Sequence, residues 1–168
     1  MQKVSLYKSG KLRFIATLLC ILWASLIFSM SAEVAEDSAN RSGEIVEMVV
    51  PLIVEDFEEK DPLTQLEIIE FAENITRKTA HFCIFSVFGV LVLLASLGFE
   101  RTWKIHLSNS VFIGFLYAIS DEVHQHFVPG RAPMIRDVVI DTLGVICGVM
   151  ALLLVVKFVL KRKNRRKI

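Results

Sequence analysis

The chain lacks the residues of a disulfide-rich protein and the motifs of common cofactor or metal enzymes. It has only three cysteines, Cys20, Cys83 and Cys147, and each lies inside a different apolar run. An odd number in such surroundings argues against a disulfide framework, and we expect small apolar packing residues. There is also no HExxH pair of histidines and no glycine-rich phosphate loop. The sequence therefore predicts no cofactor.

Long apolar runs are the main feature that is present. The chain is 54% hydrophobic, whereas an ordinary soluble domain is about 45–50% apolar even with glycine included. The excess lies in four runs, at about residues 14–31, 79–99, 105–120 and 138–160. A run of roughly 18 or more apolar residues is long enough to cross a bilayer as a helix. We therefore predict an all-α membrane bundle of about four transmembrane helices, the third being the most polar.

The first apolar run, from Phe14 to about Ser31, has two interpretations. Ser29 and Ser31 precede Ala32 in the small-x-small pattern of a signal-peptidase site. The run is, however, longer than the usual apolar region of about 7–15 residues in a cleaved signal peptide. We expect an uncleaved membrane helix, with a cleaved signal peptide as the alternative.

The segment from Ala32 to Arg77 reverses the composition of the first run. It contains thirteen acidic residues, and its apolar residues recur at helical spacing between Ile45 and Phe57. Pro51 is expected to kink or end that helix, and Asp61-Pro62 has the form of an N-cap and first helical residue. We predict an acidic outer loop with an amphipathic helix near the membrane surface.

The distribution of basic residues predicts an orientation, because Lys and Arg concentrate in cytoplasmic loops. Four basic residues precede the first run, two lie between the second and third runs, and six follow the fourth run. Four spans place these segments on one side, so we expect both termini in the cytoplasm. The chain then divides into residues 1–31, 32–77, 78–160 and a basic tail, 161–168. Beside a membrane helix, such a tail indicates an anchor to anionic lipid, and no nucleic-acid partner is expected.

With this topology, ionisable side chains from three helices reach the same membrane depth at the outer rim. Such residues are costly in a membrane and by default indicate a function, although capping and helix register are a structural alternative. In the last run, Gly144 and Gly148 have the small-residue spacing of a close helix contact, on the face that carries two aspartates. The candidate polar cluster comprises Lys78, His81, Asp121, Glu122, Gln125, Arg131, Asp137 and Asp141.

Three segments of this cluster resemble the VanZ-like family of membrane proteins. Residues 77–82 (RKTAHF) resemble its RKxAHF motif, residues 121–131 (DEVHQHFVPGR) its DExxQxFxPGR motif, and residues 137–144 (DVVIDTLG) the start of its last helix. Many members carry Asn where this chain has Asp141. The resemblance covers about residues 75–150 and implies a multi-pass protein of the bacterial cytoplasmic membrane. The family is named for a protein of low-level teicoplanin resistance, and no reaction is attached to it.

Three functions compete at this point. The first is binding of an envelope lipid, a peptidoglycan precursor or a lipoglycopeptide, with Lys78 and Arg131 holding the anionic head and Phe82, Phe85 and Phe127 lining an apolar slot. The second is an intramembrane enzyme, in which Glu122 and His126 are weak metal-ligand candidates that His81, Asp137 and Asp141 would complete. The third is a structural or regulatory subunit. The absence of a catalytic motif favours a binding protein over an enzyme, and the sequence does not indicate an oligomeric state.

Overall fold

The protein is a bundle of long helices with almost no other regular structure. A computed structural model describes residues 3–5, 7 and 9–165, with the backbone alone described for residues 3, 35–41, 160, 161 and 163–165. Lys8, Arg166 and Lys167, counted above among the basic residues, lie outside this range. The chain is 82% helical, which confirms the all-α prediction. The helices are α1 (Gly10–Ser31), α2 (Ala35–Ile53), α3 (Pro62–Ser96), α4 (Trp103–Gln125) and α5 (Ile135–Arg165).

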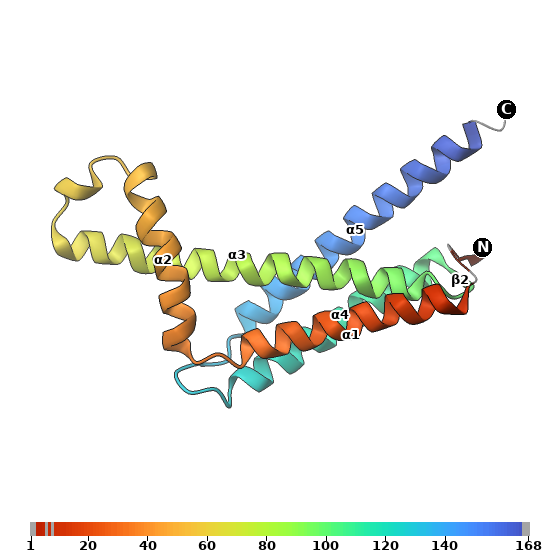
Figure 1. Cartoon of the computed structure of the whole chain (residues 1–168), viewed down its shortest axis with the longest axis horizontal. Helices are drawn as coiled ribbons and strands as arrows, with labels where there is room; N and C mark the ends of the chain where they lie inside the picture. The colour runs from red at the N-terminus through yellow and green to blue at the C-terminus, as the bar shows by residue number, and fades with distance from the viewer. Residues whose placement is uncertain (1–2, 6, 8, 166–168) are drawn as a thin grey trace.

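Four of these helices form the bundle, and α2 lies outside it (Figure 1). Helix α1 runs beside α4, while α3 packs against α1, α4 and α5. The first part of α3 projects beyond the other three helices and carries α2 and the 3-10 turn η1 (Phe57–Glu59). The two ends of the chain lie at the opposite end of the bundle. The polar loops between α1 and α3 and between α4 and α5 are thus separated from the termini by the length of the bundle.

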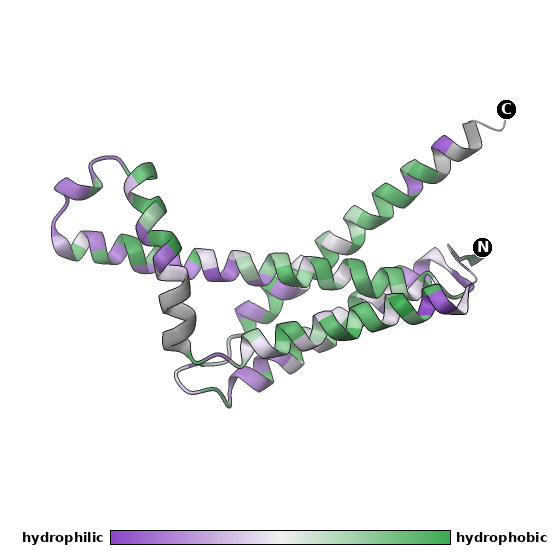
Figure 2. Cartoon of the chain, in the orientation of Figure 1, coloured by the Kyte–Doolittle hydropathy of each residue, from purple (hydrophilic) through white to green (hydrophobic). Residues whose placement is uncertain are grey.

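Three helices are long and apolar enough to cross a membrane: α1, α3 and α5 up to Val159. Figure 2 shows apolar residues along α1 and α3, which run side by side, and along α5, which crosses α3 and extends away from the other helices. Helix α4, the expected third span, has 23 residues but does not reach the same hydropathy. Polar residues lower the hydropathy of α4, and two of them, His106 and Ser110, are completely buried within the protein. Part of the polarity of α4 therefore faces protein, although Ser108 and Asn109 are exposed, and the bundle has four long helices of which three are apolar by themselves.

Helices α3 and α5 cross at very close range, and glycine makes this possible. The backbone of Phe82 lies directly against Gly144, and that of Ser86 lies against Gly148. On α3, Gly89 lies in the same way against the backbone of Val145. A Cβ atom at any of these glycines would overlap backbone atoms of the other helix. Small residues thus allow the two backbones to meet, and this contact brings His81 on α3 near Asp141 on α5.

The predicted amphipathic helix of the acidic segment is present as α2. Its buried residues Val46 and Val50 pack with Phe57 of η1 against the start of α3. Helix α2 ends at Ile53, two residues after Pro51. Asp61 is the N-cap of α3, where its carboxylate accepts hydrogen bonds from the backbone N–H groups of Leu63 and Thr64 at 3.1 Å. The Thr64 hydroxyl and these N–H groups lower the pKa of the Asp61 carboxyl, as expected for a helix N-cap.

At the end of the bundle that holds the termini, a short strand pair closes the fold. Strand β1 (Lys3–Val4) pairs antiparallel with β2 (Arg101–Thr102), which lies in the predicted turn between the second and third runs. Next to it, His106 Nδ1 lies 2.7 Å from the Ser96 hydroxyl, and His106 Nε2 lies 3.1 Å from the carbonyl oxygen of Val4. Residues 3–4 are therefore held against the start of α4 by backbone and side-chain hydrogen bonds.

Candidate functional site

A polar cavity of about 210 Å³ opens where α3, α4, α5 and the connection between α4 and α5 meet. Seven of the eight predicted cluster residues line it, and Asp121 lies beside two of them, His81 and Asp141. Arg77 and Arg136 add two arginines to these seven residues, and Asn74 and Arg77 were absent from the predicted set. The lining residues that carry charge or an amide are Asn74, Arg77, Lys78, His81, Glu122, Gln125, Arg131, Arg136, Asp137 and Asp141.

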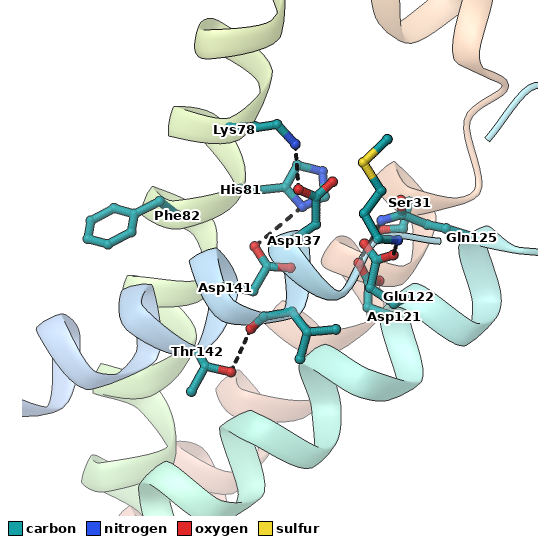
Figure 3. A network of polar contacts seen from close by, with 12 residues as sticks. Ser31, Lys78, His81, Phe82, Asp121, Glu122, Gln125, Asp137, Asp141 and Thr142 are labelled. Carbon is teal, nitrogen blue, oxygen red and sulfur yellow. Dashed lines mark hydrogen bonds and ion pairs between the residues drawn. The ribbon is translucent and has the colours of Figure 1, made fainter. Parts of the chain in front are cut away.

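Helix α3 contributes a lysine and a histidine that meet two aspartates of α5. Lys78 Nζ donates to Asp137 Oδ1 in an ion pair, and both side chains are partly exposed in the cavity. One turn further, His81 Nδ1 lies 3.7 Å from Asp141 Oδ1. Figure 3 shows these two pairs one above the other between the helices. Lys78 and His81 are three residues apart on α3, and Asp137 and Asp141 are four apart on α5, so each pair lies about one turn from the other.

Helix α4 contributes Asp121, Glu122 and Gln125, which are all buried. Asp121 Oδ2 accepts hydrogen bonds from the Ser31 hydroxyl and from Gln125 Nε2, each at 2.9 Å (Figure 3). Ser31 is the last residue of α1, so this helix also positions the site. The sequence analysis treated Ser31 only as part of a possible cleavage pattern, because nothing in its local sequence distinguishes it from an ordinary interfacial serine.

The connection between α4 and α5 is shaped by a tight turn and by Glu122. The N–H of Arg131 donates to the carbonyl oxygen of Val128 at 3.2 Å, and Gly130 has a φ of 79°. Proline at the second position and a glycine of positive φ at the third are the pattern of a type II turn. After this turn, the N–H of Met134 donates to Glu122 Oε2 at 2.8 Å. Glu122 thus fixes the start of α5 over the cavity.

Arg131 crosses from this connection to the end of α1. Its Nε donates to the carbonyl oxygen of Glu33 at 3.0 Å, and its side chain also borders a smaller cavity of about 140 Å³ with Arg77 and His81. Burial, and secondarily the charge of Arg77, lowers the pKa of the Arg131 guanidinium from its usual value. A guanidinium remains charged at any physiological pH. The cavity therefore keeps permanent positive charge close to its carboxylates.

A large apolar groove of about 670 Å³ adjoins the polar cavity on the outer side of α4 and α5. Glu122 and Met134 line both, so the cavity and the groove adjoin at these two residues. Phe127, which is 78% exposed, and His126 lie at the polar end of the groove. The other groove residues are apolar: Phe115, Ile119, Val123, Pro133, Ile135, Val138 and Val139.

The predicted aromatic slot is only partly present. Phe127 lines the groove, but Phe82 points away from the polar cluster (Figure 3), and Phe85 is buried in the core with Phe88 and Tyr117. The wrong part of the prediction came from the spacing of Phe82 and Phe85 along one turn of α3. Spacing places residues on a helix face, whereas their neighbours depend on how the helix is rotated against α4 and α5.

One group of side chains in the site has the composition of a metal site. His81, Asp121 and Asp141 each offer one ligand atom, and these atoms lie within 4.8 Å of one another. The weak candidates from the sequence, Glu122 and His126, do not belong to this group; they line the groove instead. The sequence analysis named His81 and Asp141 as residues that would complete a metal site, but with Asp137 rather than Asp121, because the three residues come from three different helices.

Comparison with known proteins agrees with the motifs of the site. The VanZ/LLP1 family model matches residues 14–157, which cover α1 to most of α5 and include every residue of the polar cluster. No curated protein and no solved structure matches the chain. A family match over this much of the sequence shows the relationship by itself. The chain belongs to the VanZ/LLP1 family of membrane proteins.

Proposed function

We propose that this protein binds a membrane amphiphile, with the anionic head group in the polar cavity and the hydrocarbon chain in the apolar groove. The observation that carries the proposal is that the cavity and the groove adjoin, because Glu122 and Met134 line both. A head group in the cavity and a chain in the groove would then belong to one molecule that passes beside Glu122 and Met134. Binding sites of this kind combine mostly apolar surface with a few placed polar groups.

The charges of the cavity favour an anionic head group. Arg77, Lys78, Arg131 and Arg136 all line it, and hydrogen bonds from such groups to phosphate or carboxylate are about twice as strong as neutral ones. The ion pair between Lys78 and Asp137 and the bond from Arg131 to Glu33 hold two of these side chains in place. An incoming anion would therefore meet donors that are already ordered.

The size of the cavity restricts what enters it. A volume of about 210 Å³ is below the roughly 300–1,000 Å³ of pockets that hold a whole drug-sized ligand. The cavity accommodates a phosphate or carboxylate group with its nearest atoms. For a peptidoglycan precursor or a lipoglycopeptide, the larger sugar or peptide part would remain outside the protein.

We further propose that the cavity faces the outside of the cytoplasmic membrane. The basic N-terminal segment and the end of α5 lie at the other end of the bundle from the cavity (Figure 1), and basic segments favour the cytoplasmic side. A reporter enzyme that is active only outside the cytoplasm, fused after residue 60, should be active, and the same reporter fused after residue 168 should be inactive. The reverse pattern would place the cavity in the cytoplasm.

The binding proposal is tested by native mass spectrometry of the protein after gentle extraction. The wild type should retain an anionic lipid. Lys78→Ala and Arg131→Ala should each weaken binding by about tenfold or more, because each loses a charge-assisted contact. The matched control is Lys104→Ala, an exposed lysine at the start of α4 and far from the cavity. Equal lipid retention in all four proteins, each shown to be folded by circular dichroism, contradicts the proposal.

Teicoplanin is a candidate ligand within this class, because a lipoglycopeptide joins a lipid tail to a polar head. The groove of about 670 Å³ would take the tail. Cells that produce the wild type should then tolerate more teicoplanin than cells that produce Arg131→Ala at the same level. If the two strains have equal tolerance while the purified proteins differ in lipid retention, teicoplanin is not the ligand and an envelope lipid is.

A further inference from the structure

We propose that His81, Asp121 and Asp141 form a binding site for one divalent transition-metal cation of the Mn²⁺ or Zn²⁺ kind. The three residues come from α3, α4 and α5, and their ligand atoms lie within 4.8 Å of one another. They sit beside the polar cavity, which His81 and Asp141 line. The cation would join three helices of the bundle at a single point (Figure 3).

The strongest argument is the hydrogen bonding of the two carboxylates. Asp121 is 2% exposed and Asp141 is 1% exposed. Among the residues that the structure describes, the buried side-chain atoms without a hydrogen-bond partner are Asp121 Oδ1, His124 Nε2 and both carboxylate oxygens of Asp141. Buried polar groups are nearly always hydrogen-bonded, and a buried charge is paired or binds a metal. Three carboxylate oxygens without a hydrogen bond, of which one has only a long ion pair with the His81 imidazole, are therefore the environment that a cation would complete.

The ion pair with His81 does not by itself remove this need. His81 Nδ1 lies 3.7 Å from Asp141 Oδ1, which is too long for a hydrogen bond. A protonated imidazole carries one positive charge, whereas Asp121 and Asp141 together carry two negative charges when ionised. A divalent cation between them balances both carboxylates and leaves the imidazole neutral, as a metal ligand must be.

The surroundings of Asp121 resemble the outer shell of a metal site. Ser31 and Gln125 both donate to Oδ2, at 2.9 Å. These two bonds fix the orientation of the carboxylate, and its other oxygen, Oδ1, accepts no hydrogen bond. Hydrogen-bonded partners that orient a ligating carboxylate in this way are typical of metal sites. On the other side, the ring of Phe85 stacks on His81 at 6.5 Å between centroids, which restricts the rotation of the imidazole.

The donor set decides the kind of metal. One imidazole nitrogen with two carboxylates suits Mn²⁺, Fe²⁺ or Zn²⁺, whereas Ca²⁺ and Mg²⁺ prefer oxygen ligands alone. Ligand atoms at about 2.1 Å from such a metal lie roughly 3–4 Å from one another. The observed limit of 4.8 Å requires the side chains to close by about 1 Å, which small side-chain rotations provide. Three protein ligands also leave positions open, as in catalytic rather than structural zinc sites.

Because the cation would lie beside the polar cavity, an anionic group held there is the natural additional ligand. That part of the inference rests on the proposed lipid binding, but the cation site itself does not. The metal is therefore tested alone, without lipid, so that failure of one proposal is distinguishable from failure of the other.

The experiment uses the full chain in detergent micelles, stripped with a chelator and titrated with MnCl₂ while the signal of free Mn²⁺ is followed by electron paramagnetic resonance. We expect one bound Mn²⁺ per chain, with pulsed spectra that show coupling to one imidazole nitrogen. Asp141→Asn should weaken binding at least tenfold, and His81→Gln should remove the nitrogen coupling. The matched control Glu70→Gln, an exposed carboxylate on α3, should bind as the wild type does.

Two results overturn the inference. One is substoichiometric binding by the folded wild type, and the other is bound Mn²⁺ whose spectra show no imidazole nitrogen. Because both are measured on the wild type, they stand even if a variant fails to fold. Competition with ZnCl₂ then ranks the two metals, since displacement of Mn²⁺ by equimolar Zn²⁺ assigns the site to zinc.

Discussion

The bundle buries polar residues at both of its ends, and the two ends treat them in opposite ways. At the end with the termini, His106 is fully buried, but both of its ring nitrogens have partners, in Ser96 and Val4. At the other end, Asp141 is equally buried and neither of its carboxylate oxygens accepts a hydrogen bond. At the end with the termini the buried polar group has all its hydrogen bonds, as in a structural contact. At the other end the buried carboxylate has none, as in a ligand-binding site.

This difference teaches that burial of an ionisable residue in a membrane helix is not enough to identify a functional site. The useful signals are unmet hydrogen-bonding capacity and an adjoining cavity. His106 has neither, because the described residues around it satisfy both ring nitrogens and none of the three cavities includes it. Asp141 has both. The predictions below separate the two ends by the sign and size of their effects.

The largest expected effect is at the structural end. His106→Ala should destabilise the protein by about 2–4 kcal/mol, because it opens a cavity and leaves the Ser96 hydroxyl and the Val4 carbonyl without their partner. Thermal unfolding in detergent, followed by circular dichroism, measures the loss. Lipid and Mn²⁺ binding by the folded fraction should remain at the wild-type level. A change in either affinity without a loss of stability would show that the comparison is wrong.

The next effect has the opposite sign and lies at the cavity end. Asp141→Asn should stabilise the metal-free protein by about 1–3 kcal/mol, because it replaces a buried carboxylate that has no hydrogen-bond partner and only a long ion pair with His81. His81 is partly exposed, so water can solvate it after the ion pair is lost. The measurement is the unfolding temperature in the presence of a chelator. With Mn²⁺ added, the order should reverse, since only the wild type gains stability from bound metal. A variant less stable than the wild type in chelator contradicts this account.

A smaller effect is expected from Ser31→Ala, which removes one of the two hydrogen bonds to Asp121. The loss of stability should be about 1 kcal/mol, and Mn²⁺ affinity should fall about tenfold, as for other partners that orient a ligand. The control is Ser25→Ala, an exposed serine on α1 whose hydroxyl donates to Ile21. If Ser31→Ala binds Mn²⁺ as tightly as that control, Ser31 does not position Asp121.

The smallest effect on stability is expected from Lys78→Met. Its ion pair with Asp137 is partly exposed, and such pairs contribute about 0–1 kcal/mol. The same change should nevertheless weaken lipid retention by about tenfold, because it removes a cation from the cavity. Comparing unfolding temperature with native mass spectra separates the two roles. A large loss of stability with unchanged lipid retention would make Lys78 a structural residue like His106.

The sequence was a good guide to the helices and to the residues of the cavity. The apolar runs predicted α1, α3 and α5 because lipid solvation imposes a local requirement that each helix must meet by itself. The Asp61-Pro62 pair marked the start of α3 because capping acts within one turn. The charged residues near Lys78, Glu122 and Asp137 indicated the site because ionisable groups at membrane depth are rare enough to stand out.

Other features could not be predicted because they depend on how the helices are rotated and paired. The role of Ser31 requires that the end of α1 meet Asp121, 90 residues away in the chain. The apolar groove is lined by residues of α4, of α5 and of the connection between them, and no local pattern encodes that space. The mistaken slot of Phe82 and Phe85 has the same origin, since helical spacing does not say which neighbour a face will meet.

The sequence alone therefore determined a membrane bundle of α-helices with charged residues collected near one end, because hydropathy, capping and charge are properties of short segments. Only the tertiary structure decided which of those charges meet, which are satisfied and which are left without partners. The reason is physical: a hydrogen bond or a metal ligand set depends on distances of a few ångströms between different helices. In this protein those distances are set largely by the glycine contact between α3 and α5.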